Sequence, residues 1–176
     1  MRKLVESTFV SLGGVISDPQ VWGPPYWNDE HDEYAHKLLF AADALLLGRR
    51  TYEGFAEQYP SLTGPFADRM NGLPKHVAST TLHEATWNAT IIEGDVASHV
   101  AELKRQPGLS ILKYGTGRLD RTLMEHGLID EFHFWLFPVA VGNGQRLFAS
   151  IETKTDLRLV DKTTFSTGIV VLTYTQ

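Results

Sequence analysis

The segment 110–127 narrows the possible folds of this chain more than any other. It opens with a short apolar run, typical of a strand, and continues into a turn that contains Gly115 and Gly117. Leu119 and Leu123 then recur at helical spacing. This order predicts a strand, a tight glycine turn and a helix.

A junction of this kind is suited to bind a pyrophosphate. The first N–H groups of a helix have no partner inside the helix, and they carry partial positive charge. Glycines allow the backbone to turn tightly and let a ligand approach it closely. A plain strand-to-helix turn explains the same residues, because the third glycine of the Gly-x-Gly-x-x-Gly fingerprint is absent.

Composition limits the class of protein. The chain has 176 residues, enough for one domain with a proper core, and 43% of them are hydrophobic, as in ordinary globular proteins. A net charge of -5 argues against a general nucleic-acid surface. The chain has no cysteine, which removes disulfides, thiolate zinc sites and cysteine nucleophiles, and suits a reducing compartment.

Two further expectations concern membranes and metals. The longest apolar run, residues 132–141, is interrupted by His133 and Pro138 and is too short to span a bilayer. His31 and His36 have a spacing that does not stack them on one helix face. We therefore expect a soluble, cytoplasmic protein with no membrane partner and no metal site.

Periodicity and turn residues divide the chain, 1–176, into alternating strands and helices. Strands are expected at residues 4–10, 44–47, 75–78, 89–92, 110–113 and 131–137. Helices are expected at 28–42, 51–59, 96–106 and 118–126, a loop with one helical turn at most at 60–74, and a terminal hairpin at 157–164 and 168–175. The order predicts a single α/β domain with a mostly parallel sheet, helices on both faces and an antiparallel hairpin at the edge.

The loop 17–27 is rich in proline and aromatic residues. Trp22, Tyr26 and Trp27 are suited to cover a flat ligand, as a lid does. The same rings are equally suited to pin a surface loop to the protein. The sequence leaves both interpretations open.

Residues that suit a phosphate follow three of the predicted strands. In an open α/β sheet, ligands bind at the carboxyl ends of the strands. Arg49 offers a planar fork to a phosphate, and Ser79 and Thr80 offer hydroxyl groups beside it. Three such ends suggest a dinucleotide with an extra 2′-phosphate. The segments concerned are 48–51, 79–80 and 115–119.

These motifs resemble those of the dihydrofolate reductase fold, and more closely those of the reductase domain of riboflavin biosynthesis. The resemblance implies a three-layer, dihydrofolate reductase-like sandwich and NADPH as the hydride donor. It covers nearly the whole chain, and it rests on residues 11–16, 48–52, 115–119, 127–131 and 138–148.

The resemblance also implies which residues bind the cofactor and the substrate. On the adenosine 2′-phosphate side it implies Gly48, Arg49, Arg50, Thr51, Ser79 and Thr80. For the pyrophosphate it implies Gly115, Thr116, Gly117, Arg118 and Leu119, and for the nicotinamide it implies Ile16. The substrate would then lie near Trp22, Tyr26, Trp27 and Tyr114.

Two residues depart from the family pattern. Gly13 stands where the family usually has an aspartate, and Tyr114 stands where riboflavin-type reductases tend to have a glutamate. Both departures concern the substrate and leave cofactor binding intact. The resemblance therefore does not identify the substrate.

Dihydrofolate reductases place a carboxylate on the first helix to handle a proton. Asp32 matches that position best by its distance from Gly48, with Asp29 and Glu30 as near alternatives. If the aromatic loop covers Asp32, burial raises its pKa and suits it to general acid catalysis. The alternative is that the acidic cluster only favours the start of the helix.

We therefore expect an NADPH-dependent reductase of a small substrate, either heteroaromatic (pterin- or pyrimidine-like) or carbonyl-containing. One rival is a non-catalytic NADP(H)- or nucleotide-binding protein of the same fold, and another is a dimerising domain whose glycines only make turns. The apolar segment 132–137 also predicts a homodimer that buries part of Phe134, Trp135 or Phe137.

Overall fold

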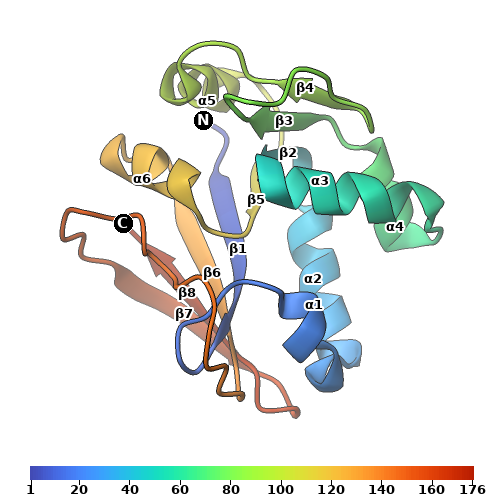
Figure 1. Cartoon of the computed structure of the whole chain (residues 1–176), viewed down its shortest axis with the longest axis vertical. Helices are drawn as coiled ribbons and strands as arrows, with labels where there is room; N and C mark the ends of the chain where they lie inside the picture. The colour runs from blue at the N-terminus through green and yellow to red at the C-terminus, as the bar shows by residue number, and fades with distance from the viewer.

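The computed structural model describes all 176 residues, and its eight strands form one sheet with helices on both faces (Figure 1). The strands are β1 (Leu4–Ser11), β2 (Ala42–Gly48), β3 (Lys75–Ala78), β4 (Ala89–Ile91), β5 (Ser110–Tyr114), β6 (Glu131–Phe137), β7 (Arg158–Thr164) and β8 (Val170–Thr175). The α-helices are α1 (Pro19–Trp22), α2 (Asp29–Phe40), α3 (Arg49–Gln58), α4 (Pro65–Gly72), α5 (Val96–Arg105) and α6 (Arg118–Glu125). Two short 3-10 helices are η1 (Pro24–Tyr26) and η2 (Tyr59–Ser61).

The strand order across the sheet is β4-β3-β2-β5-β1-β6-β8-β7. The six strands from β4 to β6 run parallel to their neighbours. β8 is antiparallel to β6, and β7 is antiparallel to β8 at the edge. The mostly parallel α/β sheet with a C-terminal antiparallel hairpin is thereby confirmed.

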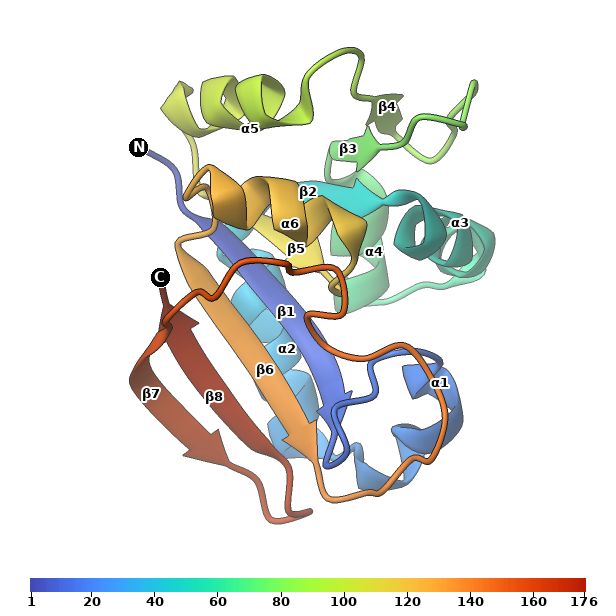
Figure 2. The same ribbon diagram turned by 60° about the vertical axis from the view of Figure 1, so that its left-hand side comes forward.

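The helices divide between the two faces of the sheet (Figure 2). One core packs α5 and α6 against the sheet, and the other packs α2, α3 and α4 against the opposite face. In β2, Leu46 belongs to the first core, whereas Leu45 and Leu47 belong to the second. Because both faces are covered, a central strand of this kind reads as a continuous apolar run.

Two segments that were expected to be loops contain helices. In 60–74, α4 begins at Pro65 and buries Ala67 and Met70. In 17–27, α1 and η1 also begin with proline. Proline suits the first position of a helix because the N–H that it lacks would have no partner there. These prolines therefore mark helix starts rather than loops.

The start of α3 also differs from expectation. Helix α3 begins at Arg49, two residues before the predicted Thr51, with Gly48 as its N-cap. Arg49 and Arg50 therefore lie in the first helical turn. None of the helices combines the length and the apolarity that crossing a membrane requires.

The residues that were predicted to form a dimer interface are already buried within the single chain. β6 lies between β1 and β8, and Phe134, Trp135 and Phe137 are 7%, 1% and 0% exposed. The apolar pattern on both faces of β6 reflects its central place in the sheet, so that part of the dimer prediction is wrong. A homodimer would need another surface.

Candidate cofactor-binding site

The predicted phosphate-binding segments lie at one edge of the sheet. β3, β2 and β5 are neighbouring parallel strands, so their carboxyl ends meet at that edge. A Cβ atom built on Gly115 would lie 3.4 Å from Thr51 Oγ1, which brings the turn after β5 against the start of α3. Helices α3 and α6 extend away from each other from these adjacent starts (Figure 1).

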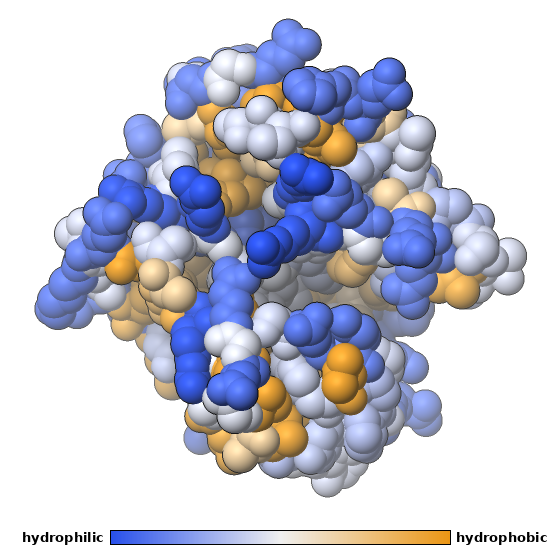
Figure 3. All heavy atoms as spheres, viewed as in Figure 1, coloured by the Kyte–Doolittle hydropathy of each residue, from blue (hydrophilic) through white to orange (hydrophobic).

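A hollow lies beside these helix starts, in the middle of the face viewed in Figure 1, and strongly hydrophilic residues line its upper rim (Figure 3). We call it the central hollow. The backbone N–H groups of Arg118 and Leu119 lie in the first turn of α6, and those of Arg49 and Arg50 lie in the first turn of α3, where an N–H has no partner within its own helix. None of them donates to a turn or loop carbonyl. Two helix N-termini therefore present unpaired donors with partial positive charge in this region.

The glycines of the turn leave room for a ligand. Gly117 has an extended backbone with φ -180°, and a Cβ atom there would have only Gln145 Nε2 nearby, at 4.0 Å. A Cβ atom on Gly48 would meet nothing within 4 Å. Gly115, in contrast, has φ +72°, which side chains rarely adopt. The turn therefore needs glycine at 115 for its shape, whereas the absence of a side chain at 117 keeps the space before α6 open.

The guanidinium group of Arg49 makes hydrogen bonds with two nearby side chains. Its guanidinium donates to Glu53 Oε1 at 2.8 Å and to Thr81 Oγ1 at 2.6 Å, and its side chain remains 48% exposed. Ser79 Oγ accepts from the N–H of Thr81 and therefore orders the turn after β3. Arg50 and Thr80 are exposed. Thr81, which was not predicted, is the hydroxyl that contacts Arg49.

Residues 138–150 join the loop after β1 to the glycine turn. The N–H of Ile16 donates to the carbonyl of Gln145 at 2.9 Å, and Arg146 donates to the carbonyl of Gly13. Ser150 Oγ donates to the carbonyl of Gly117 at 2.9 Å. The segment thus fixes Ile16 and the turn relative to each other.

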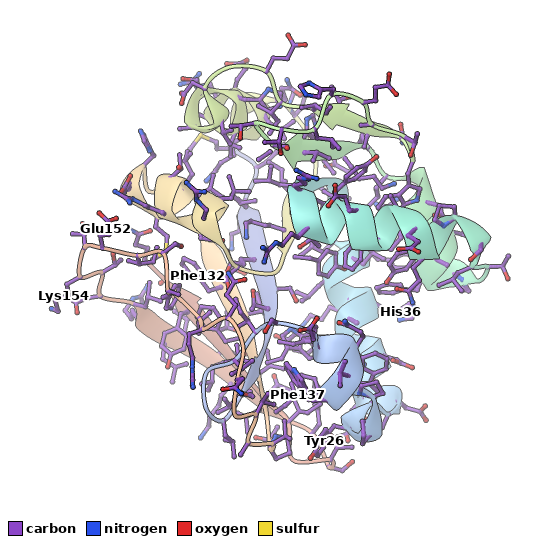
Figure 4. The ribbon with its side chains drawn as sticks, viewed as in Figure 1. Tyr26, His36, Phe132, Phe137, Glu152 and Lys154 are labelled. Carbon is purple, nitrogen blue, oxygen red and sulfur yellow. The ribbon has the colours of Figure 1, made fainter.

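The rings of Trp22 and Tyr26 pack into the protein rather than over a site. Both lie edge-on to Phe137, with ring centroids 5.2 Å and 6.0 Å away, and Figure 4 shows Tyr26 beside Phe137. Trp27 stacks on His31 at 5.4 Å and is 43% exposed. Of the two interpretations of this loop, the structure supports the loop pinned by its rings.

Tyr114 also points into the interior. Its ring lies edge-on to Phe55 at 5.5 Å, and its hydroxyl is buried without a hydrogen-bond partner. Burial raises the pKa of Tyr114, so the phenol stays neutral. The side chain therefore belongs to the core on the α3 face and is set apart from the turn that follows it.

The acidic cluster of α2 lies at the protein surface. The side chain of Asp32 is 67% exposed, so its predicted burial is wrong. Glu30 accepts from Ser166 and from Asn28, and Asn28 caps the helix by accepting from the N–H of His31. These contacts agree with the alternative that the cluster favours the start of the helix.

His31, the neighbour of Asp32, faces the interior. It is 7% exposed, and its ring lies 5.6 Å from that of Phe9 and 5.1 Å from that of Trp135. Its Nδ1 lies 3.1 Å from Asp32 Oδ1, while its Nε2 is buried without a partner. Burial lowers the pKa of His31, which favours the neutral ring.

Comparison with known proteins finds relatives that match most of this chain. The family model of the RibD C-terminal domain matches residues 2–171. The uncharacterized protein YyaP of Bacillus subtilis (strain 168) is 31% identical over 142 residues, which cover 78% of this chain and 76% of YyaP. The uncharacterized protein YwjB of the same strain is 30% identical over 166 residues, which cover 90% of this chain and 89% of YwjB.

Several solved structures share the fold. A putative riboflavin biosynthesis protein from Shewanella sp. PV-4 has a TM-score of 0.79 and 22% identity, with 98% of each chain covered. A diaminohydroxyphosphoribosylaminopyrimidine deaminase/5-amino-6-(5-phosphoribosylamino)uracil reductase from Thermotoga maritima has a TM-score of 0.69 and 16% identity, and the match covers 99% of this chain and 56% of that one. A dihydrofolate reductase from Enterococcus faecalis, complexed with NADP(H), has a TM-score of 0.59 and 17% identity over 98% of this chain and 95% of that one.

The identities to these solved structures are low, so they establish the fold alone, and the family follows from the match that spans residues 2–171. The dihydrofolate reductase-like fold predicted from the sequence is confirmed. The chain belongs to the RibD C-terminal domain family.

Proposed function

We propose that this chain is an NADPH-dependent reductase that transfers a hydride to a small substrate, either heteroaromatic (pterin- or pyrimidine-like) or carbonyl-containing. The observation that carries the proposal is the contact of Gly115 with Thr51, which brings together two helix starts with unpaired N–H groups. Membership of a reductase-type family supports it. The shared fold with a dihydrofolate reductase complexed with NADP(H) supports the choice of cofactor.

The residues at the site fit the cofactor. The N–H groups of Arg118 and Leu119 would bind the pyrophosphate in the central hollow, where Gly117 has no side chain to obstruct it. Arg49 would bind the 2′-phosphate, with Thr81 beside it. The exposed guanidinium loses little by exchanging its contact with Glu53 for one with a phosphate.

NADPH supplies the hydride, and the protein orients the reactants. Ile16 would border the nicotinamide, held in place by the backbone of Gln145. Because Asp32 is largely exposed, we propose that the proton needed for the reduction comes from water rather than from a buried carboxylate.

Two measurements test this function. The first is a fluorescence titration with NADPH, and the second follows NADPH absorbance under turnover with pterin and pyrimidine substrates. Binding with NADPH oxidation on one of these substrates supports the reductase. Binding without oxidation on any of them favours the non-catalytic nucleotide-binding alternative, and absence of binding rejects both.

A further inference from the structure

Three charged side chains are buried directly beneath the glycine turn. Glu6 of β1, Lys113 of β5 and Asp120 of α6 are 0%, 2% and 1% exposed. Glu6 and Lys113 are register partners on the adjacent parallel strands β1 and β5, so their side chains point to the same face of the sheet. Asp120 meets them from the first turn of α6, which covers that face.

The hydrogen bonds of this triad reach both glycines of the turn. Lys113 Nζ lies 3.2 Å from Glu6 Oε2 and 2.7 Å from Asp120 Oδ1, and it also donates to the carbonyl of Gly115. Glu6 and the carbonyl of Gly115 accept hydrogen bonds from the ammonium group, whereas Asp120 Oδ1 has no hydrogen-bond partner and faces the group as an ion pair. The second carboxylate oxygen of Asp120 accepts from the N–H of Gly117.

These bonds decide which backbone groups the turn presents to the central hollow. Lys113 draws the carbonyl of Gly115 toward the interior, where its negative end cannot repel a phosphate. Asp120 occupies the N–H of Gly117, which leaves the N–H groups of Arg118 and Leu119 unpaired. In this conformation the turn presents the N–H donors of Arg118 and Leu119 to a ligand, and the carbonyl acceptor of Gly115 points away from it.

The pKa values of the two carboxyl groups shift in opposite directions. Burial raises the pKa of Glu6 well above its ordinary value and the nearby Asp120 adds to this, although Lys113 opposes them. Burial disfavours the charge of Asp120, but Lys113 and the N–H of Gly117 hold its pKa below the ordinary value. Asp120 is therefore the carboxylate whose charge its surroundings favour, and Lys113 is the cation that faces it.

A simple strand-to-helix turn does not need such a cluster. Burying a charge carries a penalty of several kcal/mol per ion, and a buried ion pair often stabilises no more than apolar residues of the same size. The triad therefore contributes geometry rather than stability. Apart from Thr8 Oγ1, which donates to Glu6 Oε1, the triad's polar contacts outside itself are with Gly115 and Gly117 of the turn.

We propose that Lys113 and Asp120 are positioning residues for the cofactor's pyrophosphate, because their buried contacts with Gly115 and Gly117 hold the turn 115–117 in the conformation that directs free N–H groups into the central hollow. This inference rests on the proposed NADPH binding. The adenosine 2′-phosphate side, at Arg49, lies outside the reach of the triad's hydrogen bonds.

The test compares two substitutions of similar size. Asp120→Asn replaces one acceptor oxygen by an amide that faces either Lys113 or the N–H of Gly117, both of which are donors, so one of the two contacts is lost. Glu6→Gln is the matched control, because it has the same size, its amide oxygen can still accept from Lys113 Nζ, and Glu6 makes no hydrogen bond to the turn itself. The second test variant combines Lys113→Met with Glu6→Gln and frees the carbonyl of Gly115.

Each full-length protein is titrated with NADPH and, separately, with adenosine 2′-monophosphate, which carries the 2′-phosphate and no pyrophosphate. Loss of one charge-assisted bond corresponds to roughly tenfold or more in Kd. We expect Asp120→Asn and the Lys113→Met double variant to weaken NADPH by about that factor. In both variants the Kd for adenosine 2′-monophosphate should stay within about twofold of the wild-type value. Glu6→Gln should bind both ligands with Kd values near those of wild type.

Each outcome decides the matter. Unchanged NADPH affinity in Asp120→Asn, or equal weakening of both ligands, overturns the positioning role. If Asp120→Asn does not fold by circular dichroism, the double variant decides, and if neither folds, the triad serves the fold and the inference is rejected. If wild type binds neither ligand, the proposed function has failed; if it binds both and the variants match it, only the positioning role has failed.

Discussion

Gly117 allows the binding site to be tested without disturbing the fold. Its φ of -180° is extended backbone that any residue adopts, and the nearest atom to a new Cβ would be Gln145 Nε2 at 4.0 Å. We therefore expect Gly117→Val to fold like wild type. The added side chain would stand in the space before the first turn of α6, where the pyrophosphate is proposed to bind.

The size of the effect follows from the donors that the valine would block. Two N–H groups, those of Arg118 and Leu119, are unpaired there. Hydrogen bonds to charged groups contribute roughly 1.5–3 kcal/mol each, so losing both costs about 3–6 kcal/mol. Since each 1.4 kcal/mol is about a factor of ten, the Kd for NADPH should rise by roughly 100-fold or more.

The assay is a fluorescence titration with NADPH beside circular dichroism of the same samples. Gly54→Ala is the control, because Gly54 lies on the exposed side of α3 with nothing within 4 Å of its Cβ position. It should bind NADPH normally and gain about 0.5–1 kcal/mol of stability, since alanine favours a helix interior. Normal binding by Gly117→Val would refute the placement of the cofactor, whereas loss of its secondary structure would make the glycine structural.

Three further predictions concern single side chains. Arg49→Ala should weaken NADPH by roughly 1.5–3 kcal/mol and leave NADH almost unchanged; equal losses in parallel titrations would reject the 2′-phosphate role. Asp32→Asn should keep the turnover rate within about threefold of wild type because the carboxylate is exposed. A decrease of about 10²-fold in the turnover rate, followed by NADPH absorbance, would instead show that Asp32 acts as a general acid. The folded-state pKa of Glu6 is raised, so its contribution to stability is complete below about pH 4.5 and is lost as pH rises toward the raised value. Urea unfolding across this range should therefore show a shallower pH dependence for Glu6→Gln than for wild type, and identical slopes would contradict the burial argument.

Local patterns predicted the sheet better than they predicted the loops. The apolar run of β2 indicated a strand buried on both faces, and the structure places it between two cores. The 60–74 segment was misjudged because proline signals both a break and a helix start. Only the buried side chains that follow Pro65, such as Met70, distinguish the two, and burial is a property of the folded chain.

The sequence predicted where the candidate segments lie better than it predicted the contacts of their side chains. The rule that ligands bind at the carboxyl ends of strands identified the segments after β2, β3 and β5, and the strand order makes them neighbours. It could not predict that Thr81 contacts Arg49, because the path of the turn after β3 depends on Ser79.

The error at Asp32 was one of helical phase. Its distance from Gly48 in the sequence fixes its position along α2 but not the direction of its side chain, and adjacent helical residues point about 100° apart. His31, Tyr34, Ala35 and Leu38 recur at the spacing of a single helix face. The structure buries or half-buries all four against the sheet, so this periodicity was the signal that could have assigned His31 to the inward position.

The sequence also contains a signal of the buried triad. Glu6 interrupts the apolar pattern of β1, and Lys113 interrupts the apolar run of β5. Charged residues are almost never fully buried unless they are paired, so opposite charges in two buried strands indicate a partnership. What the sequence lacks is the strand order that makes β1 and β5 neighbours. Natural sequences break such local rules mainly at functional sites, and here both violations converge on the turn that begins α6, which is the place where the glycines alone first suggested a ligand.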